Sequence, residues 1–139
     1  MIRAATKDDL DSVYGLMKQL SRHDFTKAQF EDCYLFNLKR ERVLVYEKDD
    51  IICGCIVFNI HYPMHFSRKT AEIVNLIVGE NCRNRGIGKD LLAYLEKIAI
   101  DSGCVCLEVD SSKKREGAHR FYFREGFVCS HYKLVKGLI

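Results

Sequence analysis

The segment that most constrains the fold is an apolar strand followed by a glycine-bearing turn and a long helix. Residues 71–78 are apolar at positions facing both sides of a strand, so we expect this strand to be covered on both faces in the interior of a sheet. After the turn, apolar residues recur at helical spacing: Ile87, Leu91, Leu95, Ile98 and Ala99. The pattern predicts an α/β (α+β) chain with helices packed against a sheet.

The remaining periodicities predict the order β-α-α-β-β-β-α-β-α-β. Besides the strand at 71–78, strands are expected at 2–4, 42–47, 51–61, 104–109 and 127–135, with helices from Leu10, from about Thr26 and around Ala118. On the second helix we expect Phe30, Cys33, Tyr34, Asn37 and Leu38 to face inward. The chain has 139 residues, one proline and no repeat or linker. We therefore expect a single domain over 1–139, with a central mixed, mostly antiparallel sheet and helices on both faces.

Composition excludes several classes of protein. With 47% apolar and 29% charged residues, the sequence is typical of a folded globular chain. No apolar run approaches the ~20 residues that span a bilayer, and the first residues lack the apolar core of a signal peptide. A net charge of +3 gives little support to nucleic-acid binding. We expect a cytoplasmic protein without membrane or nucleic-acid partners.

The seven cysteines are odd in number, which favours free thiols over a disulfide framework. Two Cys-x-Cys pairs, Cys53/Cys55 and Cys104/Cys106, lie within apolar runs. Alternate strand positions share a face, so we expect both pairs to pack as small hydrophobic residues. Metal sites use other spacings, and we expect none here.

A basic, glycine-containing turn occupies residues 83–89, Arg-Asn-Arg-Gly-Ile-Gly-Lys. A strand, turn and helix start of this kind point unpaired backbone N–H groups at one spot, and residues without a Cβ let an anion approach. The turn is not a Walker A loop, because Arg83 and Asp90 stand where Gly and Ser/Thr are needed, and Leu91 replaces the third Rossmann glycine. The segment predicts a diphosphate site; the alternative is an ordinary basic turn before a solvated helix.

Two motifs carry a family resemblance. Arg83-x-x-Gly86-x-Gly88 resembles the acetyl-CoA signature of the GNAT N-acetyltransferase superfamily, and residues 118–127 match its Ala-x-x-Phe-Tyr-x-x-x-Gly-Phe motif. The resemblance implies a GNAT-like acyl-CoA acyltransferase fold and acetyl-CoA as acyl donor. It implies these donor-binding positions: Leu76, Ile77, Val78, Arg83, Asn84, Arg85, Gly86, Ile87, Gly88, Lys89, Arg115 and His119. Arg115 departs from the asparagine that many members carry there.

The resemblance also implies two catalytic residues. Glu72 is the only acid in the apolar strand, where the family often places a glutamate that accepts the amine proton. Tyr122 is expected to protonate the departing thiolate, because a phenol can match a thiol in acidity without being ionised first. Each has a plainer alternative: Glu72 marks the solvated start of the strand, and Tyr122 packs a helix onto the sheet.

Softer patterns, including the histidine-bearing loop and Ser130–Tyr132, look like the aminoalkylphosphonate N-acetyltransferases. We expect His61, His65 and Arg68 on this loop, with Asn75 in the strand after it, to bind the amine acceptor. The alternatives are solvated loop histidines and an Asn75 amide that is simply buried and hydrogen-bonded. The cationic loop suits a phosphonate, or a metal ion bridging to one. Other acceptors remain open, namely a polyamine, an aminoglycoside or a peptide N-terminus, as does a non-catalytic acyl-CoA sensor. We expect a monomer or homodimer.

Overall fold

The computed structural model describes residues 1–21 and 23–139 and divides into two compact units, residues 1–108 and 109–139. The first unit contains β1 (Ile2–Ala4), α1 (Leu10–Leu20), α2 (Lys27–Lys39), β2 (Val43–Lys48), β3 (Ile51–His61), β4 (Lys69–Val78) and α3 (Ile87–Asp101). β5 (Cys104–Val109) ends at the junction, and the second unit contains α4 (Glu116–Arg124). The predicted order of elements is confirmed up to α4.

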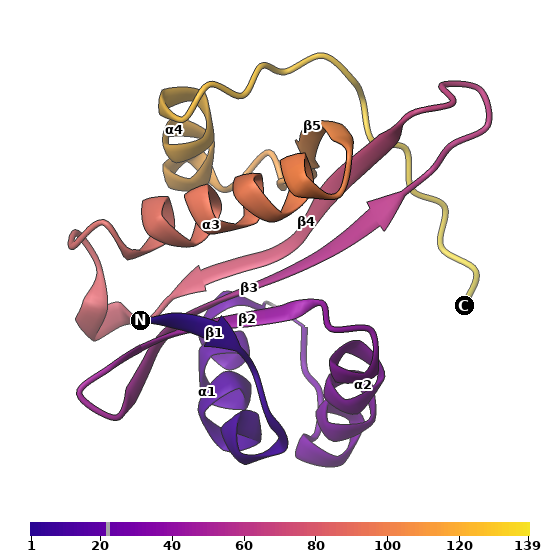
Figure 1. The fold of residues 1–139 in the computed structure, drawn as a ribbon. Helices are drawn as coiled ribbons and strands as arrows, with labels where there is room; N and C mark the ends of the chain where they lie inside the picture. Colours follow the sequence, from indigo (N-terminus) through magenta and orange to yellow (C-terminus); the bar gives the residue numbers. More distant parts are fainter. Residues whose placement is uncertain (22) are drawn as a thin grey trace. The chain divides into compact units, whose positions relative to one another are not determined.

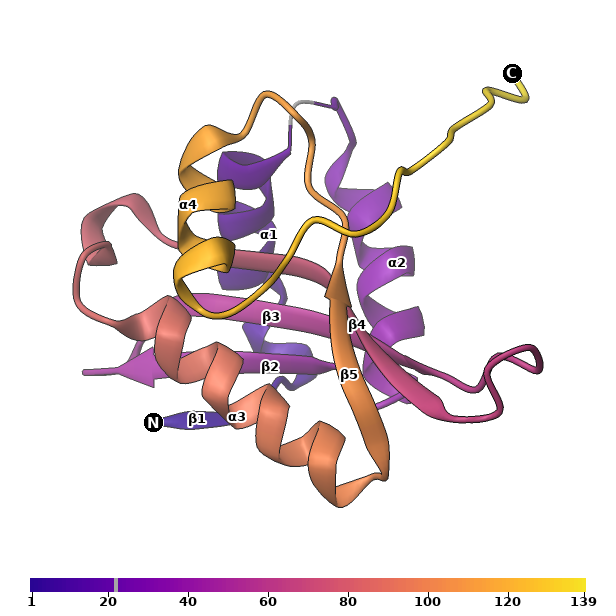
Figure 2. The same ribbon diagram turned by 90° about the horizontal axis from the view of Figure 1, so that it is seen from above.

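The sheet has five strands in the order β1-β2-β3-β4-β5, so β4 is an interior strand as predicted (Figures 1 and 2). The pairs β1–β2, β2–β3 and β3–β4 are antiparallel. A two-residue turn joins β2 to β3, with φ of 52° at Asp49 and 61° at Asp50. Positive φ at both turn residues gives a backbone twist that matches the twist of the paired strands of a hairpin. The strands predicted at 42–47 and 51–61 are therefore confirmed as an antiparallel hairpin.

Helices cover both faces of the sheet in the first unit (Figure 1). On one face, α1 and α2 bury Val13, Leu16 and Tyr34 against strand residues including Val57 and Ile77. On the other face, α3 packs so closely on β3 that a Cβ at Gly54 would lie 3.1 Å from Leu91 Cδ1. We call these two faces of the sheet the α1–α2 face and the α3 face.

Local hydrogen bonds explain where α2 begins. The Thr26 N–H donates to Gln29 Oε1 over 2.8 Å, and the Gln29 N–H donates to Thr26 Oγ1 over 3.1 Å. This reciprocal capping box satisfies two N–H groups that a helix start otherwise leaves unpaired. The predicted start at about Thr26 is therefore confirmed.

A buried carboxylate fixes the junction between β1 and α1. Asp9 is 7% exposed and accepts two bonds from Arg3, of 2.7 and 2.9 Å, and one of 2.8 Å from the Thr6 N–H. Arg3 also donates to Glu47 of β2 over 3.0 Å. The hydrogen bond from the Arg3 guanidinium, first among several causes, lowers the pKa of Asp9.

The predicted strand at 127–135 is wrong. Residues 127–139 have no regular secondary structure, although their apolar alternation fits a strand. Tyr132 and Leu134 are 90% and 92% exposed. A strand is stabilised by a hydrogen-bonded neighbour, which local periodicity does not supply.

Two smaller predictions are also wrong. Cys33 is exposed, because α2 buries Tyr34 and turns position 33 about 100° away around the helix. Cys106 is exposed because β5 is the last strand of the sheet. Cys53 and Cys55 are buried as predicted, and all seven cysteines are free thiols.

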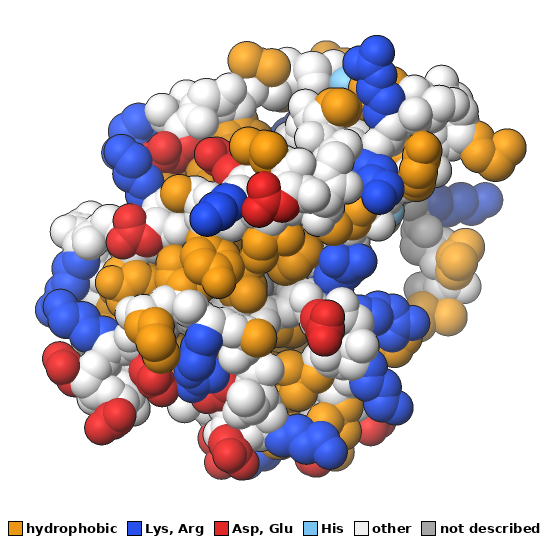
Figure 3. Space-filling model, viewed as in Figure 1, with side chains coloured by type: hydrophobic (Ala, Val, Ile, Leu, Met, Phe, Trp, Pro, Cys, Tyr) orange, Lys and Arg blue, Asp and Glu red, His pale blue; other side chains and the backbone are white. Residues whose placement is uncertain are grey.

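The described surface is mixed in charge. On the face drawn in Figure 3, acidic and basic side chains are interspersed among apolar ones. Within the described ranges, the helices are too short or too polar to cross a membrane.

Candidate active site

The turn between β4 and α3 holds its backbone in an unusual conformation. Asn84 and Gly86 have φ of 63° and 79°, in the left-handed region that glycine adopts most readily. Gly86 is the N-cap of α3, and no side chain caps this helix start. The first helical bond runs from the Asp90 N–H to the Gly86 carbonyl over 3.0 Å. The N–H groups of Ile87, Gly88 and Lys89 therefore lie at the open end of the helix, which favours an anion.

The same turn has the space and the charge that a diphosphate needs. Among the residues that the structure describes, apart from Gly86 and its two chain neighbours, no heavy atom lies within 4 Å of the place a Cβ would take on Gly86. Arg83, Arg85 and Lys89 are exposed around it. The Arg83 Nε–H donates to the Val78 carbonyl over 3.3 Å, which ties the turn to the end of β4. These residues fit the diphosphate of coenzyme A.

β4 contains a bulge next to the predicted catalytic acid. Asn75 pairs with Val57, but Ile73 pairs with Phe58, so Val74 is an extra residue opposite the β3 ladder. Val74 is 46% exposed. A bulge re-aims side chains by shifting the alternation of the strand.

Because of this bulge, Glu72 and Asn75 lie on the same face of the sheet. Glu72 pairs with Asn59, and Asn75 pairs with Val57. Positions 57 and 59 share a face of β3, and Val57 belongs to the core under α1 and α2. The α1–α2 face thus carries a polar extension beyond its apolar core.

A histidine contacts the predicted acid on that face. His61 lies two residues beyond Asn59 on β3, which makes it the diagonal neighbour of Glu72. Its Nε2 lies 3.0 Å from Glu72 Oε1. The two side chains are 47% and 30% exposed, so the pair is open to solvent.

The connection from β3 to β4 carries the other predicted acceptor residues. His65 and Arg68 are both exposed there, and the Arg68 guanidinium lies 5.8 Å from the centre of the Phe66 ring. The loop begins directly after His61 and ends before β4, so His65 and Arg68 lie between His61 and Glu72 along the chain.

Leu76, Ile77 and Val78 form the last part of β4, which leads into the turn. On one side they pair with Ile56, Cys55 and Gly54 of β3. β5 follows β4 on the other side in the sheet order.

In the second unit, the predicted residues lie on or beside α4. Arg115 is the N-cap of α4, and His119 donates from Nε2 to the Ser112 carbonyl over 2.8 Å. Tyr122 is 8% exposed, with its ring centre 5.3 Å from those of Phe121 and Phe127.

The environment of Tyr122 keeps its phenol protonated. Desolvation raises the pKa of Tyr122, and the positive charge of Arg115 opposes that rise. A phenol ordinarily ionises near pH 10, so a raised value leaves a proton available at neutral pH.

Sequence reasoning missed Asn59 and the contact between His61 and Glu72. Asn59 is a lone amide in the apolar run of β3. It lies two positions before His61, and this spacing could have indicated that the two polar side chains share a face of the strand. The contact with Glu72 depends on the register between β3 and β4, for which one sequence carries no signal.

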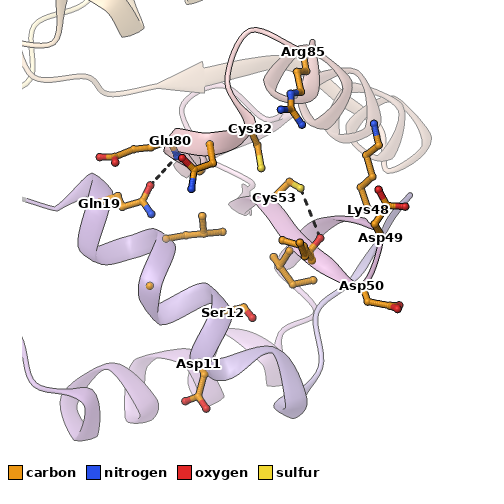
Figure 4. A pocket seen from close by; sticks show the side chains of 16 residues that line it. Asp11, Ser12, Gln19, Lys48, Asp49, Asp50, Cys53, Glu80, Cys82 and Arg85 are labelled. Carbon is orange, nitrogen blue, oxygen red and sulfur yellow. Dashed lines mark hydrogen bonds between the residues drawn. The ribbon is translucent and has the colours of Figure 1, made fainter.

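A cavity of about 650 Å³ lies elsewhere in the first unit, between α1, the β2–β3 turn and the β4–α3 turn. Figure 4 shows Arg85, Cys53 and Cys82 on one side of it and Gln19 on the other, where Gln19 Oε1 accepts from the Glu80 N–H over 3.1 Å. Among the predicted site residues of the described chain, Arg85 is the one that lines this cavity.

Comparison with known proteins agrees with this geometry. Residues 9–127 match the model of the Acetyltransferase (GNAT) family. An aminoalkylphosphonate N-acetyltransferase of Salmonella typhimurium is 34% identical over 140 residues, covering 99% of this chain and 90% of that protein.

Solved structures share the fold. A protein described as a transcriptional regulator from Bacillus halodurans superposes with a TM-score of 0.87 at 22% identity, covering 99% of each chain. Glucosamine-6-phosphate N-acetyltransferase from Arabidopsis thaliana gives 0.80 at 18% identity, covering 100% of this chain and 98% of that one. Together with the family match over most of its length, these findings show that the chain belongs to the GNAT family and is an N-acetyltransferase.

Proposed function

We propose that this enzyme transfers acetyl from acetyl-CoA to the primary amine of an aminoalkylphosphonate. The observation that carries the acetyl-CoA part is the open, uncapped start of α3, with left-handed Gly86 and three exposed cations. Backbone N–H groups, a helix dipole and charge-assisted contacts all favour the diphosphate of the donor. Asn84 and Ile87 complete this turn.

The choice of acceptor rests on chemistry and on one relative. The Salmonella protein that is 34% identical is an aminoalkylphosphonate N-acetyltransferase. In this chain, exposed His65 and Arg68 lie on the loop that connects His61 to the strand of Glu72. A guanidinium binds the oxygens of a phosphonate in the bidentate manner it uses for phosphate, and Asn75 offers an amide on the same face as Glu72.

The reaction requires a neutral amine and a protonated leaving group. A primary ammonium must lose a proton before its nitrogen attacks the thioester carbonyl, and Glu72 with its partner His61 forms the group that removes it. When the C–S bond breaks, the Tyr122 phenol protonates the thiolate. The nitrogen loses two protons in all: one leaves to water, and the other replaces the proton that Tyr122 gave to sulfur.

The remaining donor contacts are proposed for each unit by itself. The backbone of Leu76, Ile77 and Val78 is proposed to bind the acyl arm of the donor, and N–H groups directed at the thioester oxygen stabilise its developing charge. Arg115 and His119 are proposed to contact the phosphate and adenosine part.

The test measures thiol release from acetyl-CoA with a panel of amines that includes 2-aminoethylphosphonate, spermidine, an aminoglycoside and a short peptide. We expect the highest kcat/KM with the phosphonate. Calorimetry with coenzyme A is run in parallel, because binding without turnover on any amine would identify a sensor. Turnover on the other amines alone would reject the phosphonate and retain the acetyltransferase.

A further inference from the structure

We propose that His61 is the group that accepts the proton of the acceptor ammonium, and that Glu72 holds its imidazole in place. The proposal rests on the proposed function and assigns the proton-accepting step within the pair. Its basis is the contact of 3.0 Å between His61 Nε2 and Glu72 Oε1, together with the exposure of both side chains.

The contact determines which ring nitrogen is free. An ionised carboxylate only accepts hydrogen bonds, so the hydrogen in this contact belongs to Nε2. The neutral imidazole then has its lone pair on Nδ1. Glu72 therefore presents a basic nitrogen of His61 in one defined tautomer, while its own Oε1 is occupied by the bond.

The chemistry of the two groups favours the imidazole. General-base catalysis is most efficient when the base titrates near the working pH. A neutral imidazole is in general a stronger proton acceptor than a carboxylate. An alkylammonium therefore passes its proton to an imidazole at a lower free-energy cost than to a carboxylate.

The position of His61 at the end of β3 fixes its backbone in the sheet and leaves its side chain in contact with solvent, to which it can release a proton. His61 is the last residue of β3 and is more exposed than Glu72. The proton moves from the ammonium nitrogen to Nδ1, directly or through one water molecule, and the imidazolium is stabilised by the adjacent carboxylate. Nδ1 then releases this proton to bulk water, while the second proton lost by nitrogen ends on the coenzyme A sulfur.

The experiment compares His61→Ala, His61→Gln and Glu72→Gln in the full-length enzyme with acetyl-CoA and the best amine of the panel. We expect His61→Ala to lower kcat by about 10²–10⁴-fold, the usual worth of a general base, with the KM for acetyl-CoA unchanged. Added imidazole should restore part of the lost kcat of His61→Ala, because the position is open to solvent. His61→Gln keeps a hydrogen-bond donor to Glu72 but supplies no base, so we expect it to remain slow.

The control is His23→Ala, an exposed histidine outside the proposed site, whose kcat should match the parent enzyme with or without imidazole. Near-normal kcat in His61→Ala combined with a loss of 100-fold or more in Glu72→Gln would make the carboxylate itself the base. Activity regained in His61→Gln would reduce His61 to a residue that positions Glu72. Failure of the proposed function differs from all of these because it is measured in the unaltered enzyme, which would then turn over no amine or only amines other than the phosphonate.

Discussion

Gly86 meets two requirements that no other residue type combines. Its φ of 79° costs a residue with a Cβ about 1–2 kcal/mol, and the space beside it is open to a ligand. The first requirement concerns the stability of the fold, and the second concerns donor binding. A substitution separates them only if it is compared with another left-handed glycine.

Gly103 provides that comparison, because it has φ of 85° after the end of α3 and also has no heavy atom near its Cβ position. We expect Gly86→Ala and Gly103→Ala to lower the free energy of unfolding by a similar amount, about 1 kcal/mol. Gly86→Ala alone should raise the KM for acetyl-CoA, by about tenfold for each 1.4 kcal/mol of binding lost. Urea unfolding and steady-state kinetics measure the two effects. Equal KM values in the two variants would place the donor diphosphate elsewhere.

Tyr122→Phe tests the leaving-group acid. Removing the phenolic proton should lower kcat by about 100-fold without changing the KM for acetyl-CoA. Because desolvation raises the pKa of Tyr122, phenol ionisation in the unaltered enzyme should not reduce kcat below about pH 10. Tyr94→Phe, a half-exposed tyrosine on α3, should leave kcat unchanged. Full activity in Tyr122→Phe would leave Tyr122 with a packing role.

At the scale of elements, the contact between β3 and α3 depends on the absence of one side chain. A Cβ on Gly54 would lie 3.1 Å from the Ile77 carbonyl oxygen and from Leu91 Cδ1, and 3.2 Å from Ile87 Cγ2. One of these neighbours is backbone in β4, which cannot rotate away. The close approach holds α3, and with it the turn at Gly86, against the sheet.

Gly54→Ala should therefore lower the free energy of unfolding by about 1–3 kcal/mol, the usual cost of overpacking. The matched control is Gly15→Ala in α1, where no atom lies within 4 Å of the new Cβ. There the change should raise stability by about 0.5–1 kcal/mol, because alanine favours a helix interior. Chemical denaturation of both variants provides the measurement, and destabilisation by Gly15→Ala would refute the packing argument.

The β1–α1 junction predicts a pH dependence of stability. Asp9→Asn should cost about 2 kcal/mol at pH 7, because Arg3 loses its charged partner in a buried position. Since the pKa of Asp9 is lowered in the folded state, its stabilisation is present above about pH 4 and is lost as the pH falls through the folded value.

The Asp9→Asn variant and the parent enzyme should therefore have nearly equal free energies of unfolding at acidic pH. Urea unfolding at several pH values measures both. The neighbouring exposed residue supplies a control: Asp8→Asn should change stability by less than about 0.5 kcal/mol. A constant difference between Asp9→Asn and the parent at every pH would show that ionisation of Asp9 plays no part.

For the molecule as a whole, local sequence patterns predicted most helices and strands. The signals used, namely the spacing of apolar residues, the Asp49–Asp50 turn and the start of α2 at Thr26, each depend on residues that are close together in the sequence. They failed at residues 127–135, where the pattern of a strand is present without a partner strand. The contact between His61 and Glu72 could not be predicted either. These residues are 11 positions apart in the chain and meet only through the register between β3 and β4. The bulge at Val74 was hidden by apolar residues on both faces of the strand.

That bulge has a consequence for reading relatives of this enzyme. Counting alternate positions back from Ile77 puts the acid on the α3 face, and the additional residue at position 74 is what returns it to the opposite face. A homologue with one residue fewer between its asparagine and its glutamate would keep the acid on the same side with a straight strand. A gap of one residue in an alignment should therefore be placed at the bulge position, residue 74, so that the glutamate of the homologue is aligned with Glu72.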